Sequence, residues 1–430
     1  MFLNRARWVT DKYILLMLGV FPLFFGFQGY SNITAAKFWF FAGATLAWVL
    51  AVLALLAIGG FRGERYFLAI RPAHVAMGVF LAFGAISACL SEYGFRCLLG
   101  VRRYDGYATT LLYAAIFFGV SWLAAPRRRY AWALGISAAL CCAVAALQLM
   151  GLDPLSLYPR GTNYYDKYTA YNSAFLGTIG NVGLLAAYLC LAAPVLAVFS
   201  LRSGARRDRL LLIPAAMALG ILLLCDVDAA LVALAGCALV GVPAVLPGRR
   251  ASRGAACISA GLAAAGLGAL YFWPGQSGLC YELGQALHGN LADEFGSHRG
   301  EIWKRAWELF RQKPWFGGGP GTAAARMDIH WSRYIAEADR TNAVSVTNTH
   351  NVYLGYLVNM GAFAALAYLA AAGCSFGTWL RRRERGALYP ALGCGILCYM
   401  IQDFFGLGLC LTAPMLYVAW GLLESTESAD

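Results

Sequence analysis

Residues 297–321 read SHRGEIWKRAWELFRQKPWFGGGPG and begin a polar stretch that stands out in a chain of otherwise apolar segments. Apolar side chains at 302, 303, 306, 307 and 310 follow the i, i+3, i+4 spacing of an amphipathic helix. The helix should end near Pro314, because proline inside a helix removes a backbone hydrogen bond. We expect Trp303, Trp307 and Phe310 to pack this helix against the rest of the molecule.

The glycine-rich segment 317–321 follows the predicted helix. Such a backbone can adopt positive φ angles and come close to a ligand, so its amides are candidates for holding phosphate oxygens. A simple turn explains the same glycines equally well. The polar stretch ends on Thr349, His350 and Asn351, directly before the next apolar segment. A titratable imidazole is therefore expected at the mouth of a helix.

The composition excludes a soluble globular domain. Of the 430 residues, 60% are hydrophobic and 13% are charged, and the mean hydropathy is +0.60. These values are typical of polytopic membrane proteins. Most of the 13 cysteines lie singly in apolar segments and form neither a zinc motif nor a disulfide framework. A bridge between Cys97 and Cys280, which lie in predicted loops, remains an open alternative.

The apolar segments predict an all-α fold with about twelve transmembrane helices, since each crossing needs about 20 mainly apolar residues. The predicted segments are 13–30, 37–59, 73–91, 107–125, 130–149, 176–200, 210–225, 229–246, 255–273, 351–375, 388–406 and 409–423. The two halves show no evident similarity that would mark a repeat. We therefore interpret residues 1–430 as a single transmembrane domain, with 274–350 inserted between two of its helices as a loop cap.

Basic residues indicate the orientation in the membrane. Alternate short loops hold about 20 of the 34 Lys and Arg residues, an excess that is typical of cytoplasmic loops. Both termini should then be cytoplasmic, and the cap at 274–350 should be external. The net charge of +12 has two sources. Short basic loops set the topology and contact acidic membrane lipids, and a second cluster of basic residues is external. Nucleic-acid binding is excluded, because the cytoplasmic loops are too short to form a basic domain.

Two other predicted external loops carry side chains of interest. One places Arg102 and Arg103 side by side before a helix. The second loop, 151–174, contains Tyr158, Tyr164, Tyr165, Tyr168 and Tyr171. Tyrosine is common at membrane interfaces, and its ring can also stack on a sugar. An aromatic belt and a saccharide contact are therefore both open interpretations of this loop.

Several motifs resemble the O-antigen ligase and polymerase superfamily. The most specific are an arginine-to-glycine signature and a histidine-asparagine element: Arg299, Trp303, Ala306, Pro314, Gly317, Gly319 and Gly321, then Thr349, His350, Asn351, Tyr353 and Gly361. Weaker similarities lie at Gly100, Arg103 and Gly106, and at Gly180, Asn181, Leu184 and Ala186. The resemblance covers roughly residues 95–425.

The resemblance implies an integral-membrane glycosyltransferase of the GT-C class in the bacterial plasma membrane. Its donor would be a glycan linked to a polyprenyl diphosphate such as undecaprenyl diphosphate, and its acceptor a hydroxyl on a glycan, a lipid or a protein. Transfer would take place on the outer face, in cell-envelope polysaccharide biosynthesis, without a metal ion or organic cofactor. One segment departs from the family, because the place that usually carries an arginine reads Cys225-Asp226-Val227-Asp228-Ala229.

The implied reaction needs stabilisation of an anionic leaving group and removal of a proton from the acceptor. Arg299 is the candidate to hold the diphosphate through its planar, permanently charged guanidinium, and His350 is the candidate base. The candidate substrate-binding residues are Arg102, Arg103, Arg305 and Asn351. Either Arg102 or Arg103 replaces the missing family arginine, or the chain uses a different donor or acceptor. Cations at the membrane surface and a hydrogen-bonded histidine are the structural alternatives.

A transporter or flippase for a lipid-linked saccharide is the alternative function. Such a protein should carry ionisable residues at mid-membrane depth and interrupted helices in symmetry-related positions. The predicted spans are almost free of charge, and the exceptions, Asp226, Asp228 and Asp403, lie near their ends. The sequence therefore favours glycan transfer, and it does not choose between polymerisation and ligation.

Overall fold

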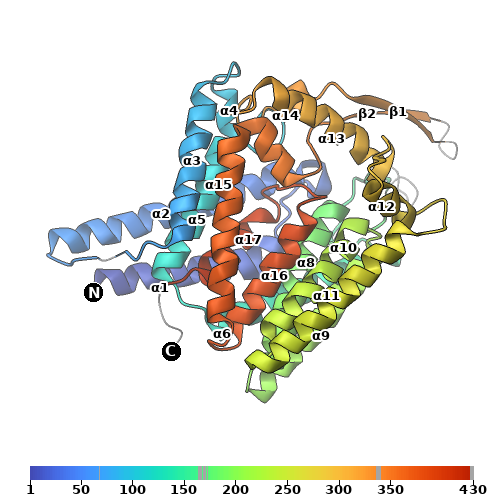
Figure 1. Ribbon diagram of the computed structural model, residues 1–430. Coiled ribbons are helices and arrows are strands. Elements are labelled where there is room, and N and C mark those ends of the chain that lie inside the picture. The colour runs from blue at the N-terminus through green and yellow to red at the C-terminus, as the bar shows by residue number, and fades with distance from the viewer. Residues whose placement is uncertain (67, 163–166, 168–170, 172, 336–339, 427–430) are drawn as a thin grey trace.

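The structure is a computed structural model, and it describes residues 1–66, 68–162, 167, 171, 173–335 and 340–426. The fold is a helical bundle with a cap at one end (Figure 1). The strands β1 (His330–Ile335) and β2 (Arg340–Ser345) form an antiparallel hairpin in that cap. The α-helices are α1 (Phe2–Leu15), α2 (Ile33–Phe61), α3 (Pro72–Cys89), α4 (Arg96–Leu99), α5 (Tyr107–Leu123), α6 (Arg128–Leu149), α8 (Val182–Arg202), α9 (Leu212–Leu224), α10 (Asp228–Val245), α11 (Arg249–Tyr271), α12 (Leu279–Leu287), α13 (Phe295–Gln312), α14 (Ala323–Arg326), α15 (Val352–Arg382), α16 (Leu388–Gln402) and α17 (Ala413–Leu423).

Seven of the described helices are long and apolar enough to cross a membrane: α2, α3, α6, α8, α10, α11 and α15. The shorter apolar helices α5, α16 and α17 accompany them. An α-helix satisfies its own backbone hydrogen bonds, which is what a chain in lipid requires. Each predicted apolar segment overlaps a helix, so the all-α polytopic fold is confirmed. The number of crossings, about twelve, stays a prediction.

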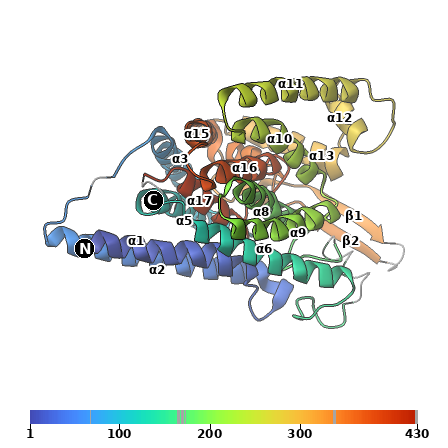
Figure 2. The same ribbon diagram turned by 90° about the horizontal axis from the view of Figure 1, so that it is seen from below.

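Helix α8 lies at the centre of the bundle, and α11 lies at its edge (Figure 2). Most residues of α8 are buried, and it packs against α9, α10 and α16. Asn181 caps its first turn, because the side-chain oxygen accepts the backbone N–H of Leu184 at 3.0 Å. By contrast, α11 has no buried residue although its sequence is apolar. A helix of this kind fits surroundings as apolar as lipid.

The basic loops gather at the end of the bundle opposite the cap. Contacts that join them are Arg71 with Glu424 (3.5 Å), Arg128 with Asp208 (2.6 Å), Arg382 with the carbonyl oxygen of Ser425 (2.6 Å) and Arg383 with the hydroxyl of Ser252 (3.0 Å). The loops that sequence analysis assigned to one side of the membrane therefore meet in space. Which side of the membrane this end faces stays a prediction.

The cap, residues 274–350, lies above the start of α15 and contains α12, α13, α14 and the hairpin (Figure 1). The connection between α3 and α5 holds it in place. The contacts are Lys313 with the Glu92 carboxylate (2.5 Å), the Ser91 hydroxyl with the carbonyl oxygen of Gly318 (2.7 Å) and the Val101 N–H with the carbonyl oxygen of Gly321 (3.1 Å). The same connection carries Arg102 and Arg103.

Helix α13 includes the amphipathic segment that the sequence predicted, but its start and its buried face differ from expectation. Residues 296–298 adopt left-handed backbone angles, and the regular helix begins at Arg299. The buried face consists of Ile302, Ala306 and Leu309. Trp307 is 51% exposed, so the prediction that it packs the helix against the bundle is wrong. It lies roughly 140° around the helix from Ile302, at 100° per residue.

The glycine segment 317–321 forms a turn packed against α15. The backbone N–H groups of Gly317, Gly318 and Gly319 donate to protein carbonyl oxygens at 3.0, 3.1 and 2.8 Å. Gly319 has a φ of 114°, a conformation that a residue with a side chain rarely adopts. Because these amides are already hydrogen-bonded, they cannot also hold a phosphate. The structure therefore favours the simple turn over the phosphate cradle.

Candidate active site

Arg299 is held by backbone carbonyl groups. Its Nε donates to the carbonyl oxygen of Phe405 at 3.2 Å, and its Nη1 donates to the carbonyl oxygen of Gly296. No described carboxylate forms an ion pair with it, although Asp228 and Glu282 lie close enough to act on its charge. Burial lowers the pKa of the guanidinium. The group nevertheless keeps its charge at neutral pH, because arginine titrates far above neutrality. Arg299 is therefore positioned by neutral groups, and its charge is free to meet an anion.

His350 lies where the cap joins α15. Its backbone has a φ of 46°, which is uncommon for a residue other than glycine. Local hydrogen bonds stabilise this conformation: the His350 N–H donates to the Asn348 side-chain oxygen at 3.0 Å, and the Thr349 hydroxyl donates to the carbonyl oxygen of Asn351 at 2.7 Å. No hydrogen bond joins the imidazole ring to a described residue, so neither ring nitrogen is committed to a described partner.

The structure brings Arg299 and His350 together. Trp303, one helical turn after Arg299, donates its indole N–H to the carbonyl oxygen of Thr349 at 3.1 Å, next to His350. Burial and, after it, the charges of Arg299 and Arg103 lower the pKa of His350 to about 4. The imidazole is therefore neutral at neutral pH and able to accept a proton. Arg103 and Arg299, from two other segments, thus lie close enough for their charges to act on His350.

Arg103 is half-buried in the loop between α4 and α5, and burial lowers the pKa of its guanidinium. Asp105, two residues on, was not singled out by sequence analysis. Burial raises the pKa of its carboxyl group. Asp105 also lines a cavity of about 90 Å³ together with Thr349 and Asn351, the neighbours of His350. The local sequence does not mark Asp105 as a cavity residue, because the cavity forms only when the loop between α4 and α5 meets α15.

The other predicted substrate-binding residues are placed differently. Arg102 is exposed. Arg305 forms an ion pair with Glu308 at 2.9 Å on α13, and no described contact joins it to Arg299 or His350. Asn351 caps α15, because its side-chain oxygen accepts the Leu354 N–H at 2.9 Å. It also lines the cavity beside Asp105. The structure therefore groups Arg103 and Asn351 with the candidate site, whereas it gives Arg102 and Arg305 no such place.

The segment that departs from the family pattern meets Arg299. Asp228 begins α10 and lines a small pocket with Arg299 and Glu282. Glu282, on α12, accepts the backbone N–H of Gly296 at 2.8 Å, so it stabilises the left-handed turn from which Arg299 extends. Nothing in the local sequence singles Glu282 out. Asp226 has a positive φ of 51° at the turn before α10. Where the family usually has an arginine, this chain therefore has a carboxylate near an arginine of the cap.

The tyrosine loop is described in part. Tyr158 is buried, with its ring 4.8 Å from that of Tyr30 and 5.3 Å from that of Tyr171. Its ring is therefore packed inside the protein, not placed in an aromatic belt or against a sugar. Tyr164, Tyr165 and Tyr168 lie outside the described residues.

The structure answers whether Cys97 and Cys280 form a disulfide. Cys97 and Cys280 are both free cysteines; Cys97 is buried and Cys280 is half-buried. Cys97 packs beneath the glycine turn of the cap, where its sulfur lies close to Gly319. The bridge that the sequence left open is therefore not formed, and the cap is attached by hydrogen bonds, ion pairs and packing.

Fold and site together define a polytopic membrane protein in which two cations and an imidazole meet at one end of a helical bundle. The family model described as O-antigen ligase matches residues 213–369. The resemblance to the O-antigen ligase superfamily is therefore confirmed over this stretch. No curated protein sequence matches the chain.

The matched stretch runs from α9 into α15 and contains the whole cap, including Arg299 and His350. Arg103 and the helices α16 and α17 lie outside it. The similarity of this stretch to the family, together with the apolar helices, points to a bacterial membrane protein and to O-antigen ligation or polymerisation, which is a glycosyl transfer at the membrane. Lipid-linked glycans and membrane lipids are the partners that this family implies.

Proposed function

We propose that this protein transfers a glycan from a polyprenyl-diphosphate donor to a hydroxyl group on the outer face of the bacterial plasma membrane. Residues 1–430 would form one transmembrane domain with both termini in the cytoplasm and the cap outside. Arg299 and Arg103 would bind the diphosphate, and His350 would be the base. The acceptor hydroxyl would belong to a glycan, a lipid or a protein.

One observation carries the proposal: the indole N–H of Trp303 joins the helix of Arg299 to the segment of His350 at 3.1 Å, where the charges of Arg299 and Arg103 act on the imidazole. Arg299 makes no ion pair with a described carboxylate, so its charge is not cancelled by a direct partner. A diphosphate has the charge and the oxygen geometry that two such groups bind. Cations placed where negative charge develops are often the largest contribution to catalysis.

The proposed reaction is a single displacement. The acceptor oxygen forms a bond to the anomeric carbon of the first sugar while the bond from that carbon to the diphosphate oxygen breaks. The electron pair of the broken bond leaves with the polyprenyl diphosphate, whose charge Arg299 and Arg103 stabilise. The acceptor proton passes to His350 and is released to solvent after the products separate.

The pKa of His350 fits this order of events. In the free protein the imidazole is unprotonated, because burial and the two cations lower its pKa to about 4. A bound diphosphate offsets the positive charges, so the pKa rises when the donor is in place. His350 thus becomes a stronger base at the moment when a proton must be removed.

The direct test is reconstitution of the purified protein in liposomes with a radiolabelled polyprenyl-diphosphate oligosaccharide and a hydroxyl acceptor. A ladder of products indicates a polymerase, and a single adduct indicates a ligase. Arg299→Ala should lower the rate by about 100-fold or more, whereas Arg305→Ala, the matched control on the same helix, should change it little. Movement of the donor across the bilayer without any new glycosidic bond would contradict the proposal and favour a transporter.

A further inference from the structure

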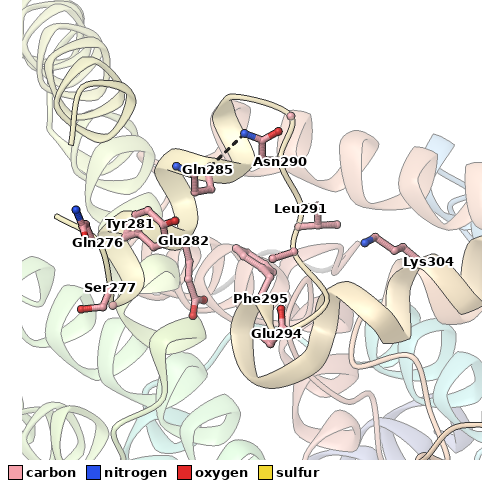
Figure 3. A pocket seen from close by; sticks show the side chains of 13 residues that line it. Gln276, Ser277, Tyr281, Glu282, Gln285, Asn290, Leu291, Glu294, Phe295 and Lys304 are labelled. Atoms are coloured by element: carbon pink, nitrogen blue, oxygen red, sulfur yellow. Dashed lines mark hydrogen bonds between the residues drawn. The ribbon is translucent and has the colours of Figure 1, made fainter. Parts of the chain in front are cut away.

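The cap contains an open groove with a volume of about 830 Å³ (Figure 3). This is within the range of roughly 300–1,000 Å³ that is usual for ligand pockets. Side chains of α12 face those of the segment between α12 and α13 across it. The polar side chains that line it include Gln276, Tyr281, Glu282, Gln285, Asn290 and Glu294. The candidate active site explained so far uses none of them except Glu282.

The groove adjoins the pocket of Arg299. Glu282 and Phe295 line the groove, and the same two residues line the small pocket that contains Arg299. Glu282 also holds the turn that precedes Arg299 through its hydrogen bond with the Gly296 N–H. The groove and the pocket of Arg299 are therefore adjacent, with Glu282 and Phe295 between them.

The lining has the chemistry of a saccharide site. Primary amides offer two donors and an acceptor at each side chain, and carboxylates accept from adjacent hydroxyl groups. Gln285 and Asn290 are already joined by a hydrogen bond of 3.2 Å, which orients the two amides next to each other at the groove (Figure 3). Half-buried Tyr281 adds a ring that can lie against the apolar face of a sugar.

The charge of the groove indicates which saccharides fit. Glu282 and Glu294 contribute two carboxylates to the lining. Lys304 also lines the groove, but its ammonium group forms an ion pair with Asp293 at 2.7 Å. The groove is therefore acidic, in contrast to the cationic site that it adjoins.

We propose that this groove binds the saccharide chain of the lipid-linked donor and selects neutral or amino-bearing sugars over acidic ones. The inference rests on the proposed function, because the donor diphosphate at Arg299 is what directs its first sugar into the groove. Uronic acids and phosphorylated sugars are disfavoured, because their negative charges approach Glu282 and Glu294. Hydroxyl and ammonium groups donate to the same carboxylates.

The test compares two polyprenyl-diphosphate oligosaccharides of equal length, one neutral and one carrying a uronic acid. The wild-type protein should show at least about a tenfold higher kcat/KM with the neutral donor. Glu294→Lys should reduce that preference about tenfold or reverse it, because Glu294 is exposed and its replacement leaves the fold unchanged. Glu308→Lys reverses the same charge on the outer side of α13, where Glu308 is also exposed, and should keep the preference of the wild type. Equal preference in the wild type and in Glu294→Lys overturns the inference.

A second measurement separates this inference from the proposed function. The free oligosaccharides, without lipid or diphosphate, are titrated against the protein in nanodiscs. If no variant transfers glycan but the neutral oligosaccharide binds and Glu294→Lys and Tyr281→Ala weaken its binding, the groove is a saccharide site and the proposed function is wrong. If transfer depends on His350 but neither donor preference nor oligosaccharide binding responds to these changes, the function stands and the groove inference is wrong.

Discussion

Trp303 donates its indole N–H to the carbonyl oxygen of Thr349 at 3.1 Å, and this hydrogen bond ties the helix of Arg299 to the segment of His350. The ring of Trp303 also lies 5.9 Å from that of Phe405, whose carbonyl oxygen accepts from Arg299. The two proposed catalytic residues therefore depend on one tryptophan for their relative position. The exposed Trp307, four residues on, has no such contact with Thr349.

Trp303→Phe should slow glycan transfer while leaving the fold intact. The substitution keeps an aromatic ring but removes the hydrogen bond to Thr349, whose net contribution is about 1 kcal/mol. A loss of this size corresponds to about a three- to tenfold lower kcat. Initial rates of transfer in liposomes measure the effect, with Trp307→Phe as the control because that side chain is half-exposed. Equal rates for the two variants would show that the link does not position the site.

Arg103 and Arg102 should differ strongly in their importance. Arg103 is half-buried and acts on His350, whereas Arg102 is exposed. Arg103→Ala should lower the transfer rate by about 100-fold or more, because it removes a cation beside the leaving group. Arg102→Ala should change the rate by no more than about twofold. If instead Arg102→Ala is the more damaging variant, the exposed arginine is the one that replaces the missing family arginine.

The pH dependence of transfer should differ between kcat/KM and kcat. Protonation of His350 inactivates a base, so activity is lost as the pH falls. In the free protein the pKa of His350 is about 4, and kcat/KM, which reports the free protein, should fall only below about pH 5. In the donor complex the diphosphate offsets the charges of Arg299 and Arg103, so kcat should begin to fall at a higher pH. Rates measured at saturating and at low donor concentration give both profiles, and coincident acidic limbs would contradict this assignment.

The orientation of the cap can be measured in intact cells. Glu308 is exposed on the cap, and Arg250 is exposed at the opposite end of the bundle. A cysteine replacing each one, in a background without other accessible thiols, should react differently with a membrane-impermeant maleimide. Glu308→Cys should be labelled in intact cells and Arg250→Cys only after lysis, because the cap is proposed to be external. The reverse pattern would place the site in the cytoplasm.

The helices were predictable because a long apolar segment in lipid has few alternatives to an α-helix. The helix at 297–310 was also predictable, since its apolar residues repeat at helical spacing. The packing of Trp307 was not, because periodicity marks a broad apolar face and does not say which aromatic on its edge meets the bundle. The left-handed turn at 296–298 was missed because positive φ angles are uncommon in residues other than glycine, and two of the three, Ser297 and His298, carry side chains.

Only the tertiary structure shows that Arg103 lies near His350 and that Arg102 and Arg305 do not. Arg102 and Arg103 precede a helix and Arg305 lies within one, but one guanidinium has the same chemistry as another. What separates them is a contact made after folding: the α3–α5 connection packs under the cap, while Arg305 turns to Glu308. Asp105 and Glu282 escaped notice in the same way, because each becomes significant only through a segment far away along the chain.

The central claim is that His350 removes the proton from the acceptor while the cations hold the donor. The most direct test measures transfer and donor binding together for the purified His350→Ala variant, with His330→Ala, an exposed histidine of β1, as the control. The account predicts that His350→Ala binds the polyprenyl-diphosphate donor as the wild type does but transfers glycan about 100-fold more slowly or worse. A His350→Ala variant that transfers glycan at the wild-type rate would contradict it.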